Sequence, residues 1–180
     1  MTRAFVALPL PEHIRSKLAV AQFLLPLPRK VPAENLHITL VFLDEVPDPV
    51  LADVHLALSA LGLPPVTLRL HGFGLFGGAR PRSLHAQVEA GPELGQMQAR
   101  IARACTMAGA PAEQRRFVPH VTLGRFRADP AEAMRLERAV AEGAGFSAGP
   151  WVADRLVLYR SDRGHDGAHH SELAAYPLTG

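Results

Sequence analysis

The sequence predicts an α/β (α+β) fold built from two copies of a β-α-β-α-β unit. Three observations predict it. Strand-like and helix-like segments alternate, the same order occurs twice, and each copy carries His-x-Thr-Leu in an apolar strand. The 180 residues amount to one domain, residues 1–180, with lobes at about 1–80 and 81–180.

The first half contains three predicted strands and two predicted helices. Strands are expected at residues 3–8, 36–43 and 66–70, where apolar and β-branched residues are concentrated. Pro11-Glu12 opens the first helix. Asp48-Pro49 opens the second, with Asp48 expected to cap the free N–H groups and proline tolerated in the first turn.

The second half repeats this order. Helices open at Pro92-Glu93 and at Asp129-Pro130, and strands are expected at residues 84–88, 120–123, 151–159 and 173–178.

The spacing of the landmarks also repeats. Pro11 to His37 spans 26 residues and Pro92 to His120 spans 28. The agreement in phase with the two His-x-Thr-Leu strings indicates a duplicated unit, whereas helix-start signals alone are common in any α/β chain.

The two His-x-Thr strings are the candidate site. Composition predicts on the order of 0.1 such strings by chance. A single strand histidine is usually a packing residue, but two at equivalent places in a repeat indicate function. Residues i and i+2 of a strand share a face, so His37 projects with Thr39 and His120 with Thr122.

Two imidazoles on opposite sides of a phosphate suit in-line displacement at phosphorus. A neutral imidazole takes a proton from the attacking oxygen while an imidazolium protonates the leaving oxygen. The ordinary histidine pKa of about 6.5 makes both forms accessible near neutral pH. The hydroxyls of Thr39 and Thr122 are placed to bind non-bridging oxygens, and no metal is required. The residues alone do not say which histidine is the acid.

Arg125 is the candidate additional cation, because its planar guanidinium matches phosphate geometry. It lies five residues after His120, an odd offset that would put it on the other strand face unless Gly124 hosts a bulge. The alternative is a solvated arginine in the basic stretch Arg125-Phe126-Arg127.

Composition sets limits on partners and location. The net charge of +2 and pI near 9.1 suit a small anion or the end of a nucleic acid. No apolar run is long enough to span a bilayer, and the first residues do not resemble a signal peptide, so a cytoplasmic, soluble protein is expected. The expected oligomeric state is a monomer. The single cysteine, Cys105, has helical spacing with Met97 and Ile101, which predicts a buried residue rather than a nucleophile.

These motifs resemble the 2H phosphoesterase superfamily, specifically the RNA 2′,3′-cyclic phosphodiesterase family, also called 2′-5′ RNA ligases. The resemblance spans nearly the whole chain. It is carried by the segments at residues 3–7, 32–43, 80–82, 117–125, 158–167 and 176–178.

The resemblance implies two lobes with antiparallel sheets, related by a pseudo-two-fold axis around a central cleft. It also implies hydrolysis of a terminal 2′,3′-cyclic phosphate of RNA to a 2′-phosphate, with reversible 2′-5′ ligation, and no cofactor. It assigns His37 as proton donor and His120 as proton acceptor, and it matches Arg125 to a phosphate-contacting arginine. The sequence departs from the family at three positions. Lys30 stands where an aromatic residue is common, His85 where tryptophan is common, and His170 where tyrosine is common.

Three alternatives remain open at this point. The stretch His165-Asp166-Gly167-Ala168-His169-His170 has metal-ligand residue types, although such residues in a turn are usually solvated. The substrate could be a small cyclic nucleotide rather than RNA. The protein could also bind an RNA end without turnover, although binding alone does not need two titrating groups.

Overall fold

A computed structural model describes residues 1–78, 80–112, 116–127, 129–164 and 167–179. The strands are β1 (Thr2–Pro9), β2 (His37–Val46), β3 (Val66–Phe76), β4 (Ser83–Ala90), β5 (His120–Arg125), β6 (Ser147–Ala153), β7 (Arg155–Gly164) and β8 (Gly167–Pro177). The helices are α1 (Glu12–Leu24), α2 (Asp48–Ser59), α3 (Pro92–Met107) and α4 (Pro130–Glu142), with short 3-10 turns η1 (Ala33–Asn35) and η2 (Gly143–Gly145).

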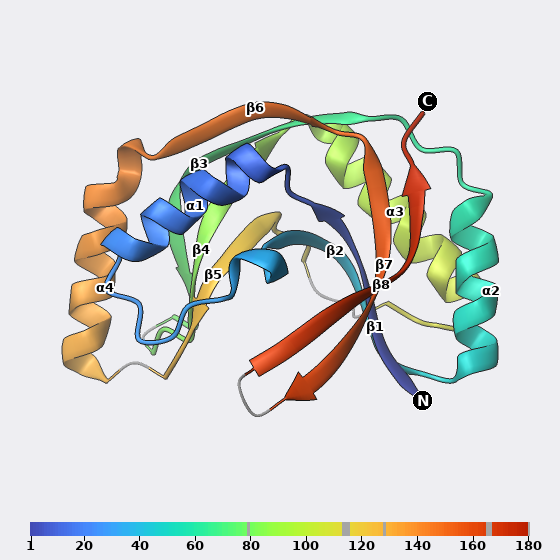
Figure 1. The fold of residues 1–180 in the computed structure, drawn as a ribbon, viewed down its shortest axis with the longest axis horizontal. Coiled ribbons are helices and arrows are strands. Elements are labelled where there is room, and N and C mark those ends of the chain that lie inside the picture. The colour runs from blue at the N-terminus through green and yellow to red at the C-terminus, as the bar shows by residue number, and fades with distance from the viewer. Residues whose placement is uncertain (79, 113–115, 128, 165–166, 180) are drawn as a thin grey trace.

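The eight strands form one curled antiparallel sheet in the order β6-β3-β4-β5-β2-β1-β7-β8 (Figure 1). The two central strands, β2 and β5, pair through a single residue pair, Ile38 and Val121. The sheet therefore consists of two four-stranded halves that meet at the two His-x-Thr strands. This confirms the predicted α/β class and the pseudo-two-fold arrangement, with one continuous sheet in place of two.

The halves of the sheet exchange strands between the repeats. The third strand of the first repeat, β3, pairs with β4, the first strand of the second repeat. In the same way β7, near the end of the chain, pairs with β1. The boundary that the repeat predicts near residue 80 thus falls between two strands that pair directly, and the N- and C-terminal segments together form one half of the sheet.

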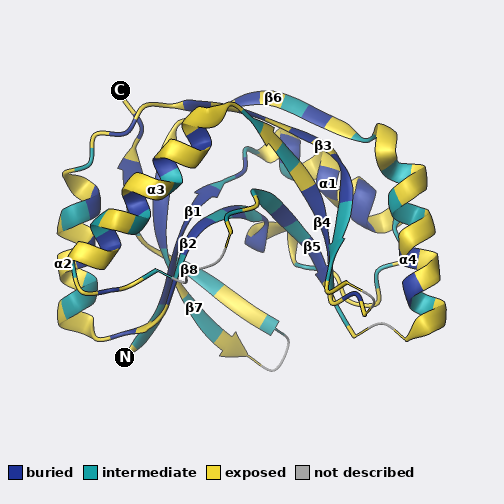
Figure 2. Ribbon diagram, turned by 180° about the vertical axis from the view of Figure 1, so that it is seen from behind, coloured by how far each residue is buried: buried dark blue, intermediate teal, exposed yellow. Residues whose placement is uncertain are grey.

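The helices pack on the outside of the curled sheet (Figure 2). Helix α1 contacts β6, and α4 contacts β3. Helix α3 contacts β2, and α2 contacts both α3 and β8. Each helix buries one apolar stripe, such as Ile14 and Leu18 in α1 or Leu94 and Ile101 in α3, against the sheet. This packing leaves the concave face, which carries the histidines, uncovered by any of the four helices.

The predicted helix starts differ in how they are capped. Helix α4 begins at Pro130 as predicted, and Asp129 caps it: the Asp129 side chain accepts a hydrogen bond from the Glu132 N–H, while the Glu132 carboxylate accepts one from the Asp129 N–H. The predicted cap at Asp48 is wrong. Pro47 occupies the N-cap position, and the Asp48 carboxylate accepts a hydrogen bond from the Thr2 hydroxyl at 2.9 Å instead.

The strand predicted at residues 151–159 is in fact two strands, which is a further correction. The chain leaves β6 at Ala153 and begins β7 at Arg155, passing from the edge of one half of the sheet to the interior of the other. The apolar runs at residues 151–153 and 156–159 are separated only by Asp154 and Arg155, and this polar pair marks the crossing.

In the described residues, no helix has the length and apolar character needed to cross a membrane.

Candidate active site

The two His-x-Thr motifs meet at the centre of the sheet. Ile38 and Val121 are fully buried and pair across β2 and β5. Because side chains alternate along a strand, His37 and Thr39 lie on the opposite face from Ile38, and His120 and Thr122 lie opposite Val121. An antiparallel register through this pair sets each histidine across from the threonine of the other motif. The structure therefore brings all four predicted residues to one place on the concave face.

Both imidazoles are anchored in the same way. Nδ1 of His37 lies 2.7 Å from the carbonyl oxygen of Asn35, and Nδ1 of His120 lies 2.7 Å from that of Val118. A carbonyl can only accept, so each Nδ1 carries the hydrogen, and Nε2 of a neutral ring is the acceptor. Each histidine thus uses the carbonyl two residues earlier to fix its tautomer and orientation.

Aromatic rings surround His37. Its ring stacks on Phe5 at 4.8 Å between centroids, and Phe5 stacks in turn on Tyr159 at 5.1 Å. His170 lies edge-on to His37 at 5.4 Å. Burial lowers the pKa of His37 to about 4, with the positive charges of His170, Arg125 and His120 acting in the same direction. Arg125 and His120 are thus close enough to act on His37, and His37 is neutral at pH 7.

The threonine of the first motif contacts its own histidine. The Thr39 hydroxyl lies 3.0 Å from Nε2 of His37, and it donates this hydrogen bond because the neutral ring accepts there. The sequence suggested only a contact from Thr39 to a phosphate oxygen.

His120 has a different aromatic neighbourhood. The ring of His85 lies 5.2 Å from the His120 ring, and Phe76 lies 4.8 Å from it, edge-on. Phe76 and His85 stack on each other at 4.0 Å. Burial lowers the pKa of His85 to about 4, so this ring is neutral at pH 7 and His120 packs against an uncharged neighbour.

A bulge turns Arg125 toward the site. Adjacent residues 84–85 of β4 pair with Gly124 and Thr122 of β5, so Leu123 is an extra residue in β5. Beyond it the alternation shifts by one, which places Arg125 on the same face as Thr122. The bulge that the sequence suggested at Gly124 is thus present one residue earlier.

The first half contains the same bulge with a different outcome. Thr39 and Val41 of β2 pair with adjacent residues 6–7 of β1, which leaves Leu40 as the extra residue. The position equivalent to Arg125 is Phe42, whose ring lies 5.1 Å from the Arg3 guanidinium carbon. The repeat therefore duplicates the histidine and threonine positions, whereas an arginine five residues after the histidine is present only in the second half.

The remaining sequence candidates lie elsewhere or differ in character. Cys105 is buried as predicted, and burial raises its pKa to about 11, so it is a thiol. In the stretch considered for a metal, His165 and Asp166 lie outside the described residues. Within the described part of the chain, no group of three or more His, Cys, Asp or Glu side chains is arranged to hold a metal ion.

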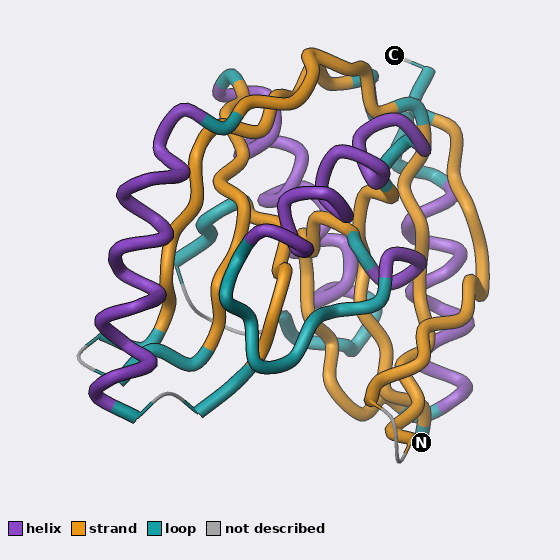
Figure 3. Tube along the Cα trace, turned by 60° about the vertical axis from the view of Figure 1, so that its left-hand side comes forward, coloured by secondary structure: helices purple, strands orange, loops and turns teal. Residues whose placement is uncertain are grey.

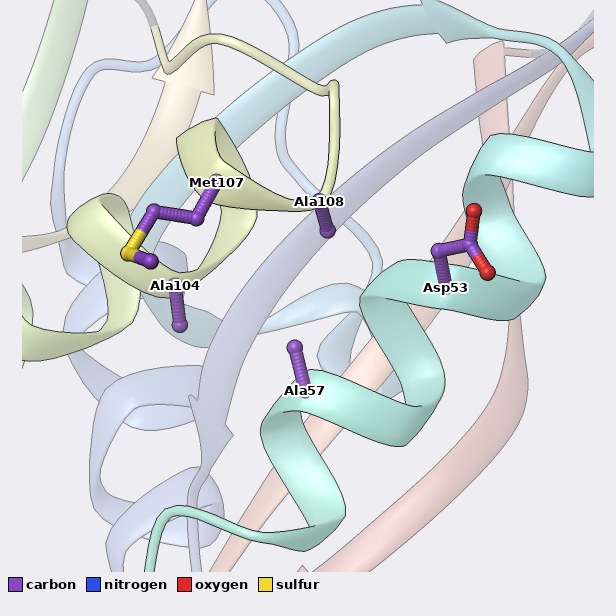
Figure 4. A pocket seen from close by; sticks show the side chains of 5 residues that line it. All are labelled: Asp53, Ala57, Ala104, Met107 and Ala108. Atoms are coloured by element: carbon purple, nitrogen blue, oxygen red, sulfur yellow. The ribbon is translucent and has the colours of Figure 1, made fainter.

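A separate pocket of about 420 Å³ lies between α2 and α3 (Figure 4). Its lining consists of Asp53, Ala57, Ala104, Met107 and Ala108. It contains one ionisable side chain and none of the residues of β2 or β5, so it offers no acid–base pair.

Sequence reasoning missed the rings that pack against the histidines. Tyr159 reaches His37 from β7, and Phe76 reaches His120 from β3. Both strands come from the opposite repeat, so their proximity depends on the strand exchange. A signal was present, because each is an aromatic residue at a matching strand position, but only the pairing of β3 with β4 and of β7 with β1 shows the match.

Known proteins are similar to this chain in fold and sequence. The sequence matches the 2′-5′ RNA ligase superfamily over residues 10–165. A Geobacillus stearothermophilus protein named RNA 2′,3′-cyclic phosphodiesterase is 30% identical over 98% of this chain and 57% of its own length. A Thermus thermophilus protein of the same name is 31% identical over 99% of this chain and 91% of its own length. The chain thus spans 57% of the Geobacillus relative, and likewise 57% of an Aeropyrum pernix relative with that name.

Solved structures show the same architecture. A Thermus thermophilus crystal structure superposes with a TM-score of 0.80 at 27% identity, covering 99% of this chain and 98% of that one. Escherichia coli LigT, crystallised with 3′-AMP, superposes with a TM-score of 0.77 at 24% identity, with the same coverage of both chains. Together with the match over residues 10–165, these similarities confirm the resemblance drawn from the paired motifs, and the chain belongs to the 2′-5′ RNA ligase superfamily.

Proposed function

We propose that this protein is a metal-independent RNA 2′,3′-cyclic phosphodiesterase that hydrolyses the terminal cyclic phosphate to a 2′-phosphate. The observation that supports it most is the matched anchoring of His37 and His120. Each Nδ1–H is held by a carbonyl two residues earlier, which leaves proton exchange with a substrate to Nε2. Relatives at 30% and 31% identity carry the name RNA 2′,3′-cyclic phosphodiesterase.

The proposed reaction moves two protons while one P–O bond replaces another. Nε2 of His120 takes a proton from a water molecule as the oxygen of that water attacks phosphorus. The bond from phosphorus to the 3′-oxygen breaks, and Nε2–H of His37 gives its proton to that oxygen. The phosphate stays on the 2′-oxygen. If the 5′-hydroxyl of a second RNA replaces water, the same steps form a 2′-5′ linkage.

The low pKa of His37 is compatible with a general acid that becomes protonated only when the substrate is bound. The unliganded His37 ring is neutral because it is buried and because positively charged groups lie near it. A bound phosphodiester brings a negative charge, which favours the imidazolium and raises this pKa toward the working range. The Thr39 hydroxyl then rotates, since a protonated Nε2 donates rather than accepts.

The other predicted residues bind the phosphate in this scheme. Arg125 lies on the face that carries Thr122 and stabilises the charge that develops on the non-bridging oxygens. Thr39 and Thr122 donate hydroxyl hydrogen bonds to the same oxygens. No step uses a metal ion.

The test is to supply an oligoribonucleotide with a 2′,3′-cyclic phosphate end in the presence of excess chelator and to identify the product against 2′- and 3′-phosphate standards. The expected product is the 2′-phosphate. A 3′-phosphate, no hydrolysis, or loss of activity that added metal restores would overturn the proposal. A 2′,3′-cyclic mononucleotide assayed in parallel separates RNA from small cyclic nucleotides as the preferred substrate.

A further inference from the structure

Positive charge is concentrated beside the site. Three segments, residues 25–33, 76–83 and 120–127, contain six of the 19 Lys and Arg residues and none of the 17 Asp and Glu residues. The rest of the chain therefore has more acidic than basic side chains. The small net charge of +2 hides a strongly asymmetric distribution, and such a field attracts a polyanion to one side of the protein.

Backbone contacts bring these segments together at the end of β5. Lys30 forms an isolated β-bridge with Gly124, and the Phe126 N–H donates to the Arg82 carbonyl at 2.9 Å. The loop between α1 and η1 passes so close that a Cβ at Gly124 would lie 2.7 Å from the carbonyl oxygen of Arg29. Figure 3 shows this loop crossing the sheet toward η1. Four cations, Arg29, Lys30, Arg82 and Arg127, thus lie around Arg125, and we call them the basic rim.

The basic rim is exposed and not neutralised. All four side chains are exposed. In the described part of the protein no ion pair involves Arg29, Arg82 or Arg127. Elsewhere arginines do pair with carboxylates, as Arg155 does with Glu172 and Arg138 with Glu142. Charges without acidic partners suit a ligand that supplies several negative charges of its own.

An exposed aromatic ring extends the basic rim. Phe23, at the end of α1, is 79% exposed, and Nζ of Lys30 lies 5.6 Å from the centre of its ring. The other seven phenylalanines, all in the described residues, are buried or partly buried. A flat apolar ring beside cations is the usual arrangement for stacking an unpaired base in single-stranded nucleic acid binding.

We propose that the basic rim and Phe23 bind the single-stranded RNA that leads to the terminal cyclic phosphate. This rests on the function proposed above. Arg125 holds the terminal phosphate, Arg82 and Arg127 hold the preceding phosphates, and Arg29, Lys30 and Phe23 contact the next nucleotides outward. Because the contacts are to phosphates and to a base face, this surface prefers longer RNA without reading its sequence.

The experiment compares a 2′,3′-cyclic mononucleotide with an eight-nucleotide RNA of the same terminal base that ends in cyclic phosphate. The double variant Arg82→Gln/Arg127→Gln should lower kcat/KM for the RNA at least 10-fold and leave the mononucleotide within 2-fold. In a plot of log(kcat/KM) against log salt, the slope should become less negative by about 1.4, because each lost phosphate contact contributes about 0.7. Phe23→Ala should lower kcat/KM for the RNA roughly 5-fold, without changing kcat/KM for the mononucleotide or the slope of the salt plot.

The matched control is Arg103→Gln/Arg135→Gln, which removes two exposed arginines from α3 and α4 and should affect neither substrate. Equal losses on both substrates, or an unchanged salt slope, would overturn the proposal. Sedimentation of the wild type and Phe23→Ala adds a further check, since a change in oligomeric state would assign Phe23 to a protein contact instead. Mononucleotide hydrolysis reports the proposed function separately, so failure of the basic rim proposal can be distinguished from failure of the proposed function.

Discussion

Gly74 lies directly across from His85 on the paired strands β3 and β4, and a Cβ at Gly74 would lie 2.7 Å from Nε2 of the His85 ring. The ring of His85 occupies the space that a side chain at residue 74 would fill. His85 in turn packs against His120. The absence of a side chain at Gly74 therefore allows the neighbour of a proposed catalytic histidine to sit where it does.

Gly74→Ala should disturb His120 without touching it. The added methyl group forces the His85 ring to move, and overpacking of this kind costs about 1–3 kcal/mol of unfolding free energy. We expect kcat for cyclic phosphate to fall about 10-fold. Gly95→Ala is the matched control, because nothing lies within 4 Å of its new Cβ on α3, where alanine should stabilise the helix. If Gly74→Ala/His85→Ala is not more active than Gly74→Ala, the clash is not the cause.

Unfolding stability should fall as the pH drops from 6.5 to about 4. His85 is buried with a pKa of about 4, whereas an unfolded histidine titrates near 6.5. Within this window the unfolded chain binds more protons, so the free energy of unfolding rises with pH and is fully present above 6.5. One such group contributes on the order of 3 kcal/mol to the free energy of unfolding above pH 6.5. His37, whose pKa is also lowered to about 4, changes the unfolding free energy in the same direction.

Denaturant midpoints measured from pH 7.5 to pH 4.5 would check this. His85→Phe keeps an aromatic ring against Phe76 and removes the titrating group, so part of the pH dependence should disappear. His13→Gln, at an exposed position on α1, is the control. A His85→Phe curve parallel to that of the wild type would contradict the assignment.

An activated substrate should separate the acid from the base. A nitrophenyl phosphodiester has a leaving group that needs no protonation, so loss of the general acid should matter little for it. We expect His37→Ala to lose about 10²–10⁴ in kcat on cyclic phosphate but far less on the activated diester, and His120→Ala to lose activity on both. The reverse pattern would exchange the two roles.

The sequence predicts the centre of this site better than its surroundings. The period of two along a strand places each histidine with its threonine, and the duplicated spacing places the two strands in equivalent positions. Those relations are local or follow from the repeat. In contrast, the contacts of Tyr159 with His37 and of Phe76 with His120 arise because β7 and β3 pair with strands of the opposite repeat. No local pattern encodes that exchange.

The same reasoning explains the errors in the strand and cap predictions. Two apolar runs separated by Asp154 and Arg155 are compatible with one strand or with two in different halves of the sheet. Asp48 has the residue type of a cap, but Thr2 of the neighbouring strand offers its carboxylate a donor. In each case a tertiary contact decides between conformations that the local sequence permits.

Arg125 gives the last prediction, because the bulge in β5 sets its direction. If it binds the phosphate through its planar fork, Arg125→Lys should keep the charge but lose the paired geometry, with kcat/KM down about 10-fold. Arg125→Gln should lower kcat/KM by a factor of about 10²–10³. Arg125 also lowers the pKa of His37, so removing its charge should raise that pKa. The histidine titration followed by NMR measures this shift in the unliganded protein. A lower His37 pKa in Arg125→Gln, or kcat/KM close to wild type, would mean that Arg125 does not face the site.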